Sequence, residues 1–384
     1  MAASGLQIGQ TVSEDDFQQT VRRLGGSGAF TNVGYTFQYS PEGTRLELHV
    51  SDAPSFVPAT FENLVWFSDD ELVEKVHSEV PLFRGQLPIT GDLPDQVSEA
   101  LQAILILQKV PGRVDYLRVA RGEDGPIEAI AYTVTGGAQI VVGAVSFTGA
   151  GAAEQAPLGD AGKQLEGSDY RRSLIVSNEE RTFLPILLER GYLRAAFGKT
   201  QAKVVRSDAQ QVVADVTIPV EEGNQYTVSA VELSGNTTIA SPMLRKTLHQ
   251  HEDQTANPVQ LDEDIKAMKM VYGTRGYMEA KITADATLND EQHTVRYLIG
   301  IQEGDVYKMG DLEIQGLDSR TTARLEDIWK LRGGDPYDSS YPKQFLEQAS
   351  KEIAEIGKWE TKVRESLDPS GKTVDVTIRF DPRR

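Results

Sequence analysis

Five stretches of this chain alternate apolar and polar residues with a period of two. Such alternation predicts β-strands that bury one face and expose the other. Each stretch follows another β-rich segment across a short turn, so five hairpins are expected. The apolar sets are Leu46, Leu48 and Val50; Ile130, Tyr132 and Val134; Val212, Val216, Ile218 and Val220; Val295, Tyr297, Ile299 and Ile301; and Val374, Val376, Ile378 and Phe380. The turns are Pro41-Glu42-Gly43, Asp124-Gly125, Ser207-Asp208, Asn289-Asp290 and Pro369-Ser370-Gly371.

Helical patterns occupy the intervals between the hairpins. The clearest one places Leu261, Ile265, Met268 and Tyr272 on a single face, and Gly276 marks its expected end. Asp262, Glu263 and Asp264 lie early in this helix, where carboxylates interact favourably with the helix dipole. Further helices are expected over Ser13–Leu24, Ser68–His77, Gln96–Gln108, Pro242–His249 and Leu325–Leu331, and around Leu346, Ala349 and Ile353.

One region does not fit a regular helix. Pro185 interrupts the helical pattern of Asn178–Arg190, and an interior proline costs about 3 kcal/mol or kinks the helix. We therefore expect a broken or late-starting helix there. The segment Gly149–Gly162 is rich in Gly and Ala, and it is expected to be an inserted loop.

The same order of elements returns along the chain. The equivalent glycines Gly223 and Gly304 stand 81 residues apart. A fixed period of this length indicates an array of like domains. The recurring pairs are Arg190-Gly191-Tyr192 with Arg275-Gly276-Tyr277, Glu222-Gly223-Asn224-Gln225-Tyr226 with Glu303-Gly304-Asp305-Val306-Tyr307, and Val231-Glu232-Leu233-Ser234-Gly235 with Leu312-Glu313-Ile314-Gln315-Gly316.

The expected fold class is α+β. About five small β-α-α-β-β units follow one another, each a three-stranded mixed sheet with two helices on one face. The first unit is expected to be incomplete, because residues 1–52 hold only one helix and one hairpin. Either this unit is naturally short or its first half is missing from the sequence. The expected domains, called here the first to fifth repeats, are residues 1–53, 54–137, 138–223, 224–304 and 305–384.

Composition excludes several classes of function. The 384 residues carry a formal net charge of −18, which argues against binding of nucleic acid or of an anionic membrane through a basic face. Cysteine is absent, so disulfides and thiolate metal sites are absent too. No apolar run approaches the roughly 18–20 residues that a membrane-spanning helix needs.

The ordered repetition resembles the polypeptide-transport-associated (POTRA) domain. The resemblance is carried by two pairs of segments. One pair is Arg-Gly-Tyr at 190–192 and 275–277. The other is Glu-Gly-x-x-Tyr at 222–226 and 303–307, and each of these is followed by a strand that ends in Gly. Residues 8–33 look like the later half of a first such domain. The second repeat departs most from the pattern, since Lys109-Val110-Pro111-Gly112 stands where Arg-Gly-Tyr would be.

This resemblance implies a location and a set of partners. POTRA domains occur in tandem in the periplasm, before the membrane barrel of BamA-type outer-membrane assembly proteins and of related transporters. The chain is therefore expected to be the periplasmic part of an outer-membrane protein, with a membrane-embedded β-barrel following the fifth repeat. Its implied partners are unfolded outer-membrane proteins, accessory assembly lipoproteins and that barrel. The alternatives are the periplasmic region of a two-partner-secretion-type transporter and a rigid spacer or adhesion array.

A small sheet has edge strands whose unpaired N–H and C=O groups can accept an added strand from a client. The resemblance implies that the second strand of each repeat lies at such an edge. These strands are expected over Asn32–Gln38, Arg113–Arg118, Ala202–Arg206, Lys281–Ala286 and Thr361–Arg364. The candidate binding residues are Val33, Tyr35, Val114, Tyr116, Val204, Val205, Ile282, Ala284 and Val363.

No other constellation points to chemistry. His249 and His251 lack the further ligands that a metal site needs, and a solvated turn explains them. Catalytic motifs, a phosphate-binding loop and a dinucleotide fingerprint are all absent. The chain is therefore expected to hold no cofactor or metal and not to be an enzyme. Arg190 and Arg275 are expected to be solvated, with the following Gly ending a helix and the Tyr packing over the hairpin.

Overall fold

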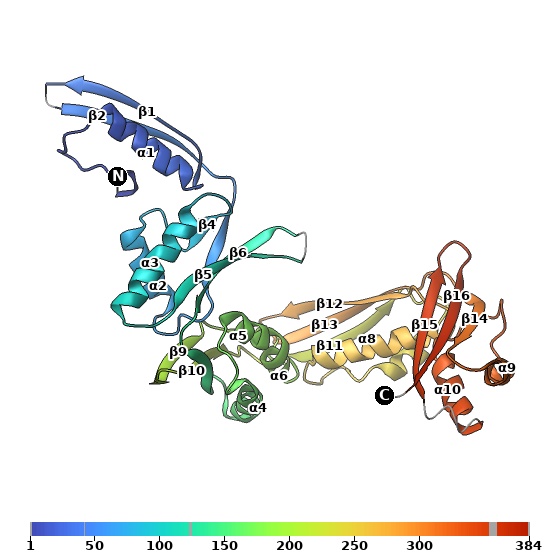
Figure 1. Cartoon of the computed structure of the whole chain (residues 1–384). Coiled ribbons are helices and arrows are strands. Elements are labelled where there is room, and N and C mark those ends of the chain that lie inside the picture. The colour runs from blue at the N-terminus through green and yellow to red at the C-terminus, as the bar shows by residue number, and fades with distance from the viewer. Residues whose placement is uncertain (1, 42, 123–124, 353–358, 383–384) are drawn as a thin grey trace. The chain divides into compact units, whose positions relative to one another are not determined.

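The computed structural model describes residues 2–41, 43–122, 125–352 and 359–382. The chain folds into two compact units, Met1–Ile186 with Ala196–Glu222, and Leu187–Ala195 with Gly223–Arg384. Within the described residues, five small sheets follow one another in chain order, accompanied by helices (Figure 1). The expected α+β class is confirmed. No helix in this part of the chain is long and apolar enough to cross a bilayer.

The first sheet holds two antiparallel strands, β1 (Phe30–Ser40) and β2 (Gly43–Asp52). A short 3₁₀ turn, η1 (Ala2–Ser4), precedes helix α1 (Glu14–Gly26), and this helix buries Phe17, Thr20 and Leu24. The Phe17 ring lies 5.7 Å from the ring of Tyr35. The predicted helix and hairpin are confirmed, although the face of β2 is less buried than the alternation suggested, and Val50 is exposed.

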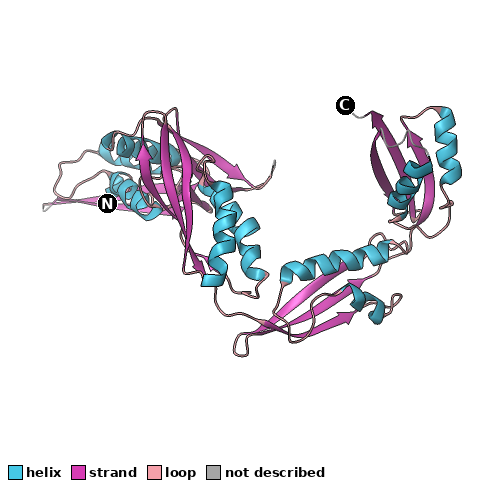
Figure 2. Ribbon diagram, turned by 90° about the horizontal axis from the view of Figure 1, so that it is seen from below, coloured by secondary structure: helices cyan, strands magenta, loops and turns pink. Residues whose placement is uncertain are grey.

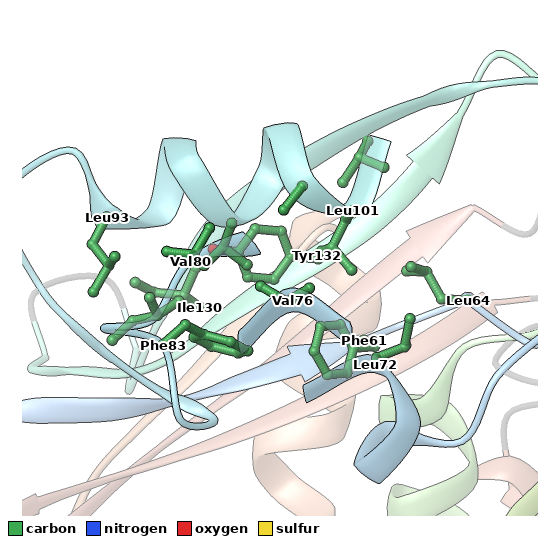
Figure 3. Packing of buried hydrophobic residues seen from close by; sticks show 14 of the residues in the cluster. Phe61, Leu64, Leu72, Val76, Val80, Phe83, Leu93, Leu101, Ile130 and Tyr132 are labelled. Carbon is green, nitrogen blue, oxygen red and sulfur yellow. The ribbon is translucent and has the colours of Figure 1, made fainter. Parts of the chain in front are cut away.

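The second sheet has the order β4-β3-β6-β5. Its strands β3 and β6 are parallel, while β5 and β4 pair antiparallel with them. Both helices pack on one face, and residues such as Leu72, Val76, Leu101 and Tyr132 are fully buried between helices and sheet (Figure 3). The elements are β3 (Phe56–Phe61), α2 (Asp69–Glu79), β4 (Gln86–Pro88), α3 (Leu93–Leu107), β5 (Arg113–Ala120) and β6 (Ile127–Thr135).

In the third sheet the central strand β10 pairs with β7 on one side and with β9 and β8 on the other. The helical segment containing Pro185 runs without a gap over residues 172–188, where a broken or late-starting helix was expected, and a π-helical turn, η3, lies between its two short α-helices. The elements are β7 (Gln139–Thr148), α4 (Ala152–Gly162), η2 (Lys163–Leu165), α5 (Arg172–Asn178), η3 (Glu179–Phe183), α6 (Leu184–Leu188), β8 (Ala196–Phe197), β9 (Gln201–Ser207) and β10 (Gln211–Glu221).

The expectation of a loop over Gly149–Gly162 is wrong, since most of this segment is helix α4. Leu158 of this helix is fully buried. A Cβ atom on Gly162 would stand only 3.1 Å from side-chain atoms of Phe147 and Val145 on β7. The small residues therefore let the helix approach the sheet closely, and they do not mark irregular backbone.

The fourth and fifth sheets share one topology, with orders β11-β13-β12 and β14-β16-β15. In each, the first strand pairs parallel and the second antiparallel with the central one. Helix α8 lies along the fourth sheet (Figures 1 and 2) and buries the predicted apolar stripe. The elements are β11 (Thr227–Ser234), α7 (Ser241–Leu244), η4 (Arg245–Thr247), α8 (Pro258–Gly273), β12 (Lys281–Asn289), β13 (Thr294–Gln302), β14 (Lys308–Gln315), α9 (Ser319–Ile328), α10 (Tyr341–Glu352), β15 (Trp359–Asp368) and β16 (Thr373–Pro382).

The alternating sets assigned to the second to fifth repeats form the buried faces of β6, β10, β13 and β16. Every one of these residues is at most 7% exposed. Three residues of the sequence predictions, Glu42, Asp124 and Ile353, lie outside the described residues.

A glycine follows the first strand in three of the repeats. Gly149, Gly235 and Gly316 have φ angles of 87°, 87° and 90°. Their Cα atoms pass so close to the central strand that a Cβ would lie 2.4, 2.1 and 2.1 Å from a carbonyl oxygen, that of Val220, Ile301 and Phe380 respectively. Only glycine satisfies both demands, which explains why the repeat ends this strand with it.

We expect Gly235→Ala to destabilise the fourth repeat by at least about 2 kcal/mol, because a left-handed Ala is strained and its Cβ meets the Ile301 carbonyl. Hydrogen exchange of the β11 and β13 amides measures the change for this repeat alone. The matched control is Gly300→Ala, in the same sheet, where the nearest atom stands 3.8 Å from the new Cβ. Equal protection in the two variants would contradict the role assigned to Gly235.

Candidate strand-binding edges

The structure places four of the predicted second strands at sheet edges. Strands β5, β9, β12 and β15 each pair with a single neighbour, which is β6, β10, β13 and β16 respectively. Strand β1 likewise pairs only with β2. The candidate residues therefore lie on edge strands, and their binding of a client stays a prediction.

The opposite edge of each later sheet is covered by the chain itself. In the fourth sheet, the loop before α8 bonds to the start of β11: the Val228 N–H donates to the Gln254 carbonyl at 2.8 Å, and the Ala256 N–H to that of Tyr226 at 2.9 Å. Sequence reasoning missed this cover, because the loop has no strand-like alternation.

The same cover recurs in the other three sheets. In the second sheet the covering segment is long enough to form strand β4, which pairs antiparallel with β3. In the third sheet the Tyr170 N–H donates to the Ile140 carbonyl at 2.8 Å, and in the fifth the Tyr337 N–H donates to that of Tyr307 at 2.9 Å. Each of these sheets therefore has one covered edge and one open edge.

The hydrogen-bonding pattern of the central strand shows which backbone groups on the open edge point away from the sheet. The Thr227 N–H donates to the His293 carbonyl at 3.0 Å, so odd-numbered residues of β13 bond toward β11 and even-numbered ones toward β12. Backbone groups alternate sides along a strand. The residues of β12 opposite the odd-numbered ones therefore turn N–H and C=O outward, and these are Ile282, Ala284, Ala286 and Leu288.

The same argument covers the other open edges. The Lys308 N–H donates to the Lys372 carbonyl, so even-numbered residues of β16 bond toward β14. Val363 of β15 stands opposite one of these, Ile378, and its backbone N–H and C=O therefore face outward. On β9 the backbone of Val204 faces outward, while Val205 is the extra residue of a bulge. Val33 and Tyr35 lie in the middle of β1 and are partly buried.

Val114 differs from the other candidates, because its outward groups are already bonded. Its N–H donates to Gln102 Oε1 at 2.8 Å, and its carbonyl accepts from Ser98 Oγ at 3.1 Å, both on helix α3. An added strand has nothing to pair with at this position. Tyr116, two residues further along β5, has no such cover among its described contacts.

The repeated motifs join consecutive elements instead of forming a binding surface. The Gly191 carbonyl accepts from the Tyr226 N–H at 2.8 Å, and the Gly276 carbonyl accepts from the Tyr307 N–H at 2.7 Å. Both glycines have positive φ. The Arg-Gly-Tyr and Glu-Gly-x-x-Tyr segments, distant in sequence, therefore meet at the start of β11 and of β14.

The tyrosines of the second motif are buried and hydrogen-bonded through their hydroxyl groups. Tyr226 donates to Asp290, which also pairs with Arg194 at 3.1 Å. The Tyr226 hydrogen bond lowers the pKa of Asp290. Tyr307 donates to Glu279 Oε2 at 2.7 Å. These contacts fix the joints and leave no open site there.

The glutamate of the second motif organises the loop after β11. Glu303 accepts hydrogen bonds from the Thr238 N–H at 2.9 Å and the Tyr272 hydroxyl at 2.8 Å, and from the hydroxyls of Thr237 and Thr238. Burial raises the pKa of Glu303, but these hydrogen bonds lower it more, and the result is about 2. Glu222 has the same role in the third repeat, where it accepts from the Gly151 N–H at 2.6 Å.

His249 belongs to a structural contact. Its Nδ1 lies 2.7 Å from Oδ1 of Asp264, whose side chain is 1% exposed and also accepts from the His249 N–H. Asp264 therefore fixes the turn before α8, which corrects its interpretation as a partner of the helix dipole. Among the described residues, no group of His, Asp and Glu is arranged to hold a metal ion.

The POTRA family model, described as "Surface antigen variable number repeat", matches residues 226–304. Those residues form a POTRA domain. The repetition of its motifs and topology along the chain supports tandem POTRA domains, similar to those of BamA-type proteins.

Two curated relatives carry the same kind of name. A putative outer membrane protein assembly factor of Treponema pallidum is 27% identical over 158 residues, covering 38% of this chain and 19% of that protein. The outer membrane protein assembly factor BamA of Neisseria meningitidis is 20% identical over 183 residues, covering 44% of this chain and 23% of that protein. The chain thus spans about a fifth of the length of these relatives.

Solved structures with similarity to the chain include BamA POTRA3-5 of Haemophilus influenzae, with a TM-score of 0.48 and 20% identity over 64% of this chain and 96% of that one. POTRA1-3 of the periplasmic domain of Omp85 from Anabaena aligns with a TM-score of 0.27 and 14% identity, over 65% of this chain and 97% of that one.

We expect Glu303 to make the fourth repeat sensitive to acid. Its folded pKa of about 2 lies below the ordinary 4.5, so its stabilising effect is complete above about pH 4.5 and is lost as the pH falls toward 2. NMR signals of β13 followed during acid unfolding measure this loss. Glu303→Gln should be less stable than wild type at pH 7, and the difference should shrink toward pH 2. The exposed control Glu291→Gln should follow wild type, and a constant difference for Glu303→Gln would contradict the assignment.

Proposed function

We propose that this chain is the periplasmic POTRA region of an outer-membrane protein assembly or insertion factor. In this proposal it holds unfolded outer-membrane proteins by β-strand addition at its open sheet edges. The single observation that carries the proposal is the asymmetry of the sheets. In the second to fifth repeats one edge is covered by the chain and the second strand is left open.

Strand addition suits a receptor for many clients. Backbone hydrogen bonds recognise an extended conformation, and they depend little on the sequence that adopts it. The outward residues Ala284 and Val363 offer such bonds on strands whose pairing with the sheet has no irregularity. Binding by these edges needs no catalytic group, so we propose a receptor and not an enzyme.

Several further parts of the proposal rest on the resemblance to POTRA arrays and on the spacing of the repeats. We propose that a membrane barrel belongs to the same protein, that accessory lipoproteins bind this region, and that the domains are divided near residues 53, 137, 223 and 304. Secretion of one dedicated partner is the nearest alternative within the same class, and a passive spacer is the alternative in which the edges bind nothing.

An extended peptide from a barrel strand, titrated onto the isotope-labelled chain, tests the proposal. We expect amide shifts concentrated on one or more of β5, β9, β12 and β15. Where β12 responds, Ala284→Pro should weaken binding roughly tenfold while the repeat stays folded, because it removes an outward N–H.

The matched control is Thr283→Pro, which removes an N–H that bonds to β13 and should unfold the fourth repeat. Val204→Pro and Val363→Pro make the same test on β9 and β15. Absence of shifts at millimolar peptide, or unchanged affinity in every outward proline variant, would favour the spacer.

A further inference from the structure

The outer face of the second sheet, the side away from its helices, is polar at one end, where Arg113 and Asp115 lie, and apolar at the other. Leu117 and Val119 of β5 are 74% and 44% exposed, and they stand opposite Ala131 and Ala129 of β6. The open strands of the last two sheets carry charged and polar residues on the corresponding face. These residues are Lys281, Thr283 and Asp285 on β12, and Glu360, Lys362 and Arg364 on β15.

This face forms one wall of a groove of about 1060 Å³. The other wall includes Arg172 and Val176 of α5, and Val176 is itself 43% exposed. Both walls belong to the first compact unit. The groove therefore presents exposed apolar side chains on two sides.

Hydrogen bonds hold the two walls together. The Arg172 N–H donates to the Glu62 carbonyl at 2.8 Å, and the Ser173 hydroxyl donates to Glu62 Oε2 at 2.7 Å. The Arg172 guanidinium pairs with Asp69 at 3.0 Å, with only 22% of its side chain exposed. The groove is thus formed before any ligand arrives.

The open edge of β5 borders this groove. The outward groups of Val114 bond to α3, while Val134 opposite it bonds through both backbone groups to the Asn63 side chain, at 2.8 and 3.0 Å. This pair is therefore not bonded across the ladder. Alternation then turns the N–H and C=O groups of Tyr116 and Arg118 outward as well, where they have no partner among the described residues.

The two faces of the sheet differ at this edge. On the helix side, Tyr116 donates to Asp95 Oδ1 at 2.8 Å, and Arg118 lies over the Tyr116 ring and donates to the Ile89 carbonyl at 3.2 Å. A strand added beside β5 places one row of side chains beside these polar groups. Its other row lies beside Leu117 and Val119, at the groove.

We propose that the β5 edge and this groove form a site selective for client strands that strictly alternate apolar and polar residues. Such alternation is the pattern of barrel strands, which have one lipid-facing and one lumen-facing row. Apolar side chains pair with Leu117 and Val119, and polar ones lie near Asp95 and Arg118. This site rests on the proposed function. It adds which edge binds the client strand and which sequence pattern that edge prefers.

Two eight-residue peptides of identical composition test the site on the full chain, one alternating Val and Thr and one with its valines in a single block. We expect the alternating peptide to shift the amides of Tyr116, Leu117 and Arg118. It should bind at least roughly fivefold more tightly than the block peptide, because alternation keeps all valines on the side of Leu117 and Val119, whereas a block of valines places half of them on the polar side.

Leu117→Ser should remove most of this preference without unfolding the chain, because the side chain is largely exposed. The matched control is Leu298→Ser, which replaces a 41% exposed leucine on the outer face of β13 and should leave both affinities unchanged. Tyr116→Pro should abolish the shifts on β5 by removing an outward N–H.

The outcomes separate this inference from the proposed function. Shifts confined to β9, β12 or β15 overturn the β5 site and leave strand addition standing. Binding at β5 with equal affinity for both peptides, or unaltered preference in Leu117→Ser, overturns the selectivity. Absence of binding on every edge overturns both.

Discussion

A sheet of three strands cannot satisfy the backbone groups of its own two edges, and the repeat is built around this constraint. In the second to fifth sheets the central strand has a parallel partner on one side and an antiparallel one on the other. The segment that leads into the second helix covers the parallel edge by only a few hydrogen bonds. The antiparallel edge receives no equivalent cover, because the chain leaves it through a hairpin and continues into the central strand. An open edge on the second strand is thus a consequence of the topology.

The repeats share an irregularity in the first strand, but different side chains lie beside it. The first strand carries an irregularity where it pairs with the central strand, which leaves an extra N–H to satisfy. In the third repeat Ala144 donates to Asp215 Oδ1 at 2.8 Å, and in the fifth Asp311 donates to Asp375 Oδ1 at 2.8 Å. Glycine precedes both donors, and a Cβ there would stand 2.3 and 2.1 Å from the carboxylate.

The fourth repeat has no such carboxylate, and this explains why its sequence differs. Arg296 stands at the equivalent place and pairs with Glu232, while Ser229 replaces the glycine and donates to the Val295 carbonyl at 3.1 Å. Sequence comparison between repeats is therefore weak even where the backbone is the same. The residues that recur visibly are those of the two short motifs, such as their glycines and tyrosines and the pair Glu222 and Glu303.

The order of elements and the buried face of each central strand were predictable from the sequence, because both depend on local periodicity. Helix α4 was not, since a run of Gly and Ala is compatible with a loop and with a helix packed closely on a strand. The edge positions of Ile282, Ala284 and Val363 followed from the resemblance to a known topology. The bonds from Gln102 and Ser98 to Val114 could not be foreseen, because they join elements whose register is set only by tertiary packing.

The open edges also differ in how they avoid uncontrolled pairing with other chains. Strand β15 is long and regular, but its outer row alternates Glu360, Lys362 and Arg364, which disfavours an apolar partner. Strand β5 carries the exposed apolar residues Leu117 and Val119, but few of its backbone groups are free to pair. At one end the backbone of Val114 is bonded to α3, and at the other the register becomes irregular after Val119. Strand β15 is long but lacks an apolar outer row, and β5 has apolar residues but little free backbone. Either property limits edge-to-edge association. Between Val114 and this irregular register, Tyr116 and Arg118 are the residues whose backbone groups face outward, so only a short stretch of an added strand could pair at the proposed site.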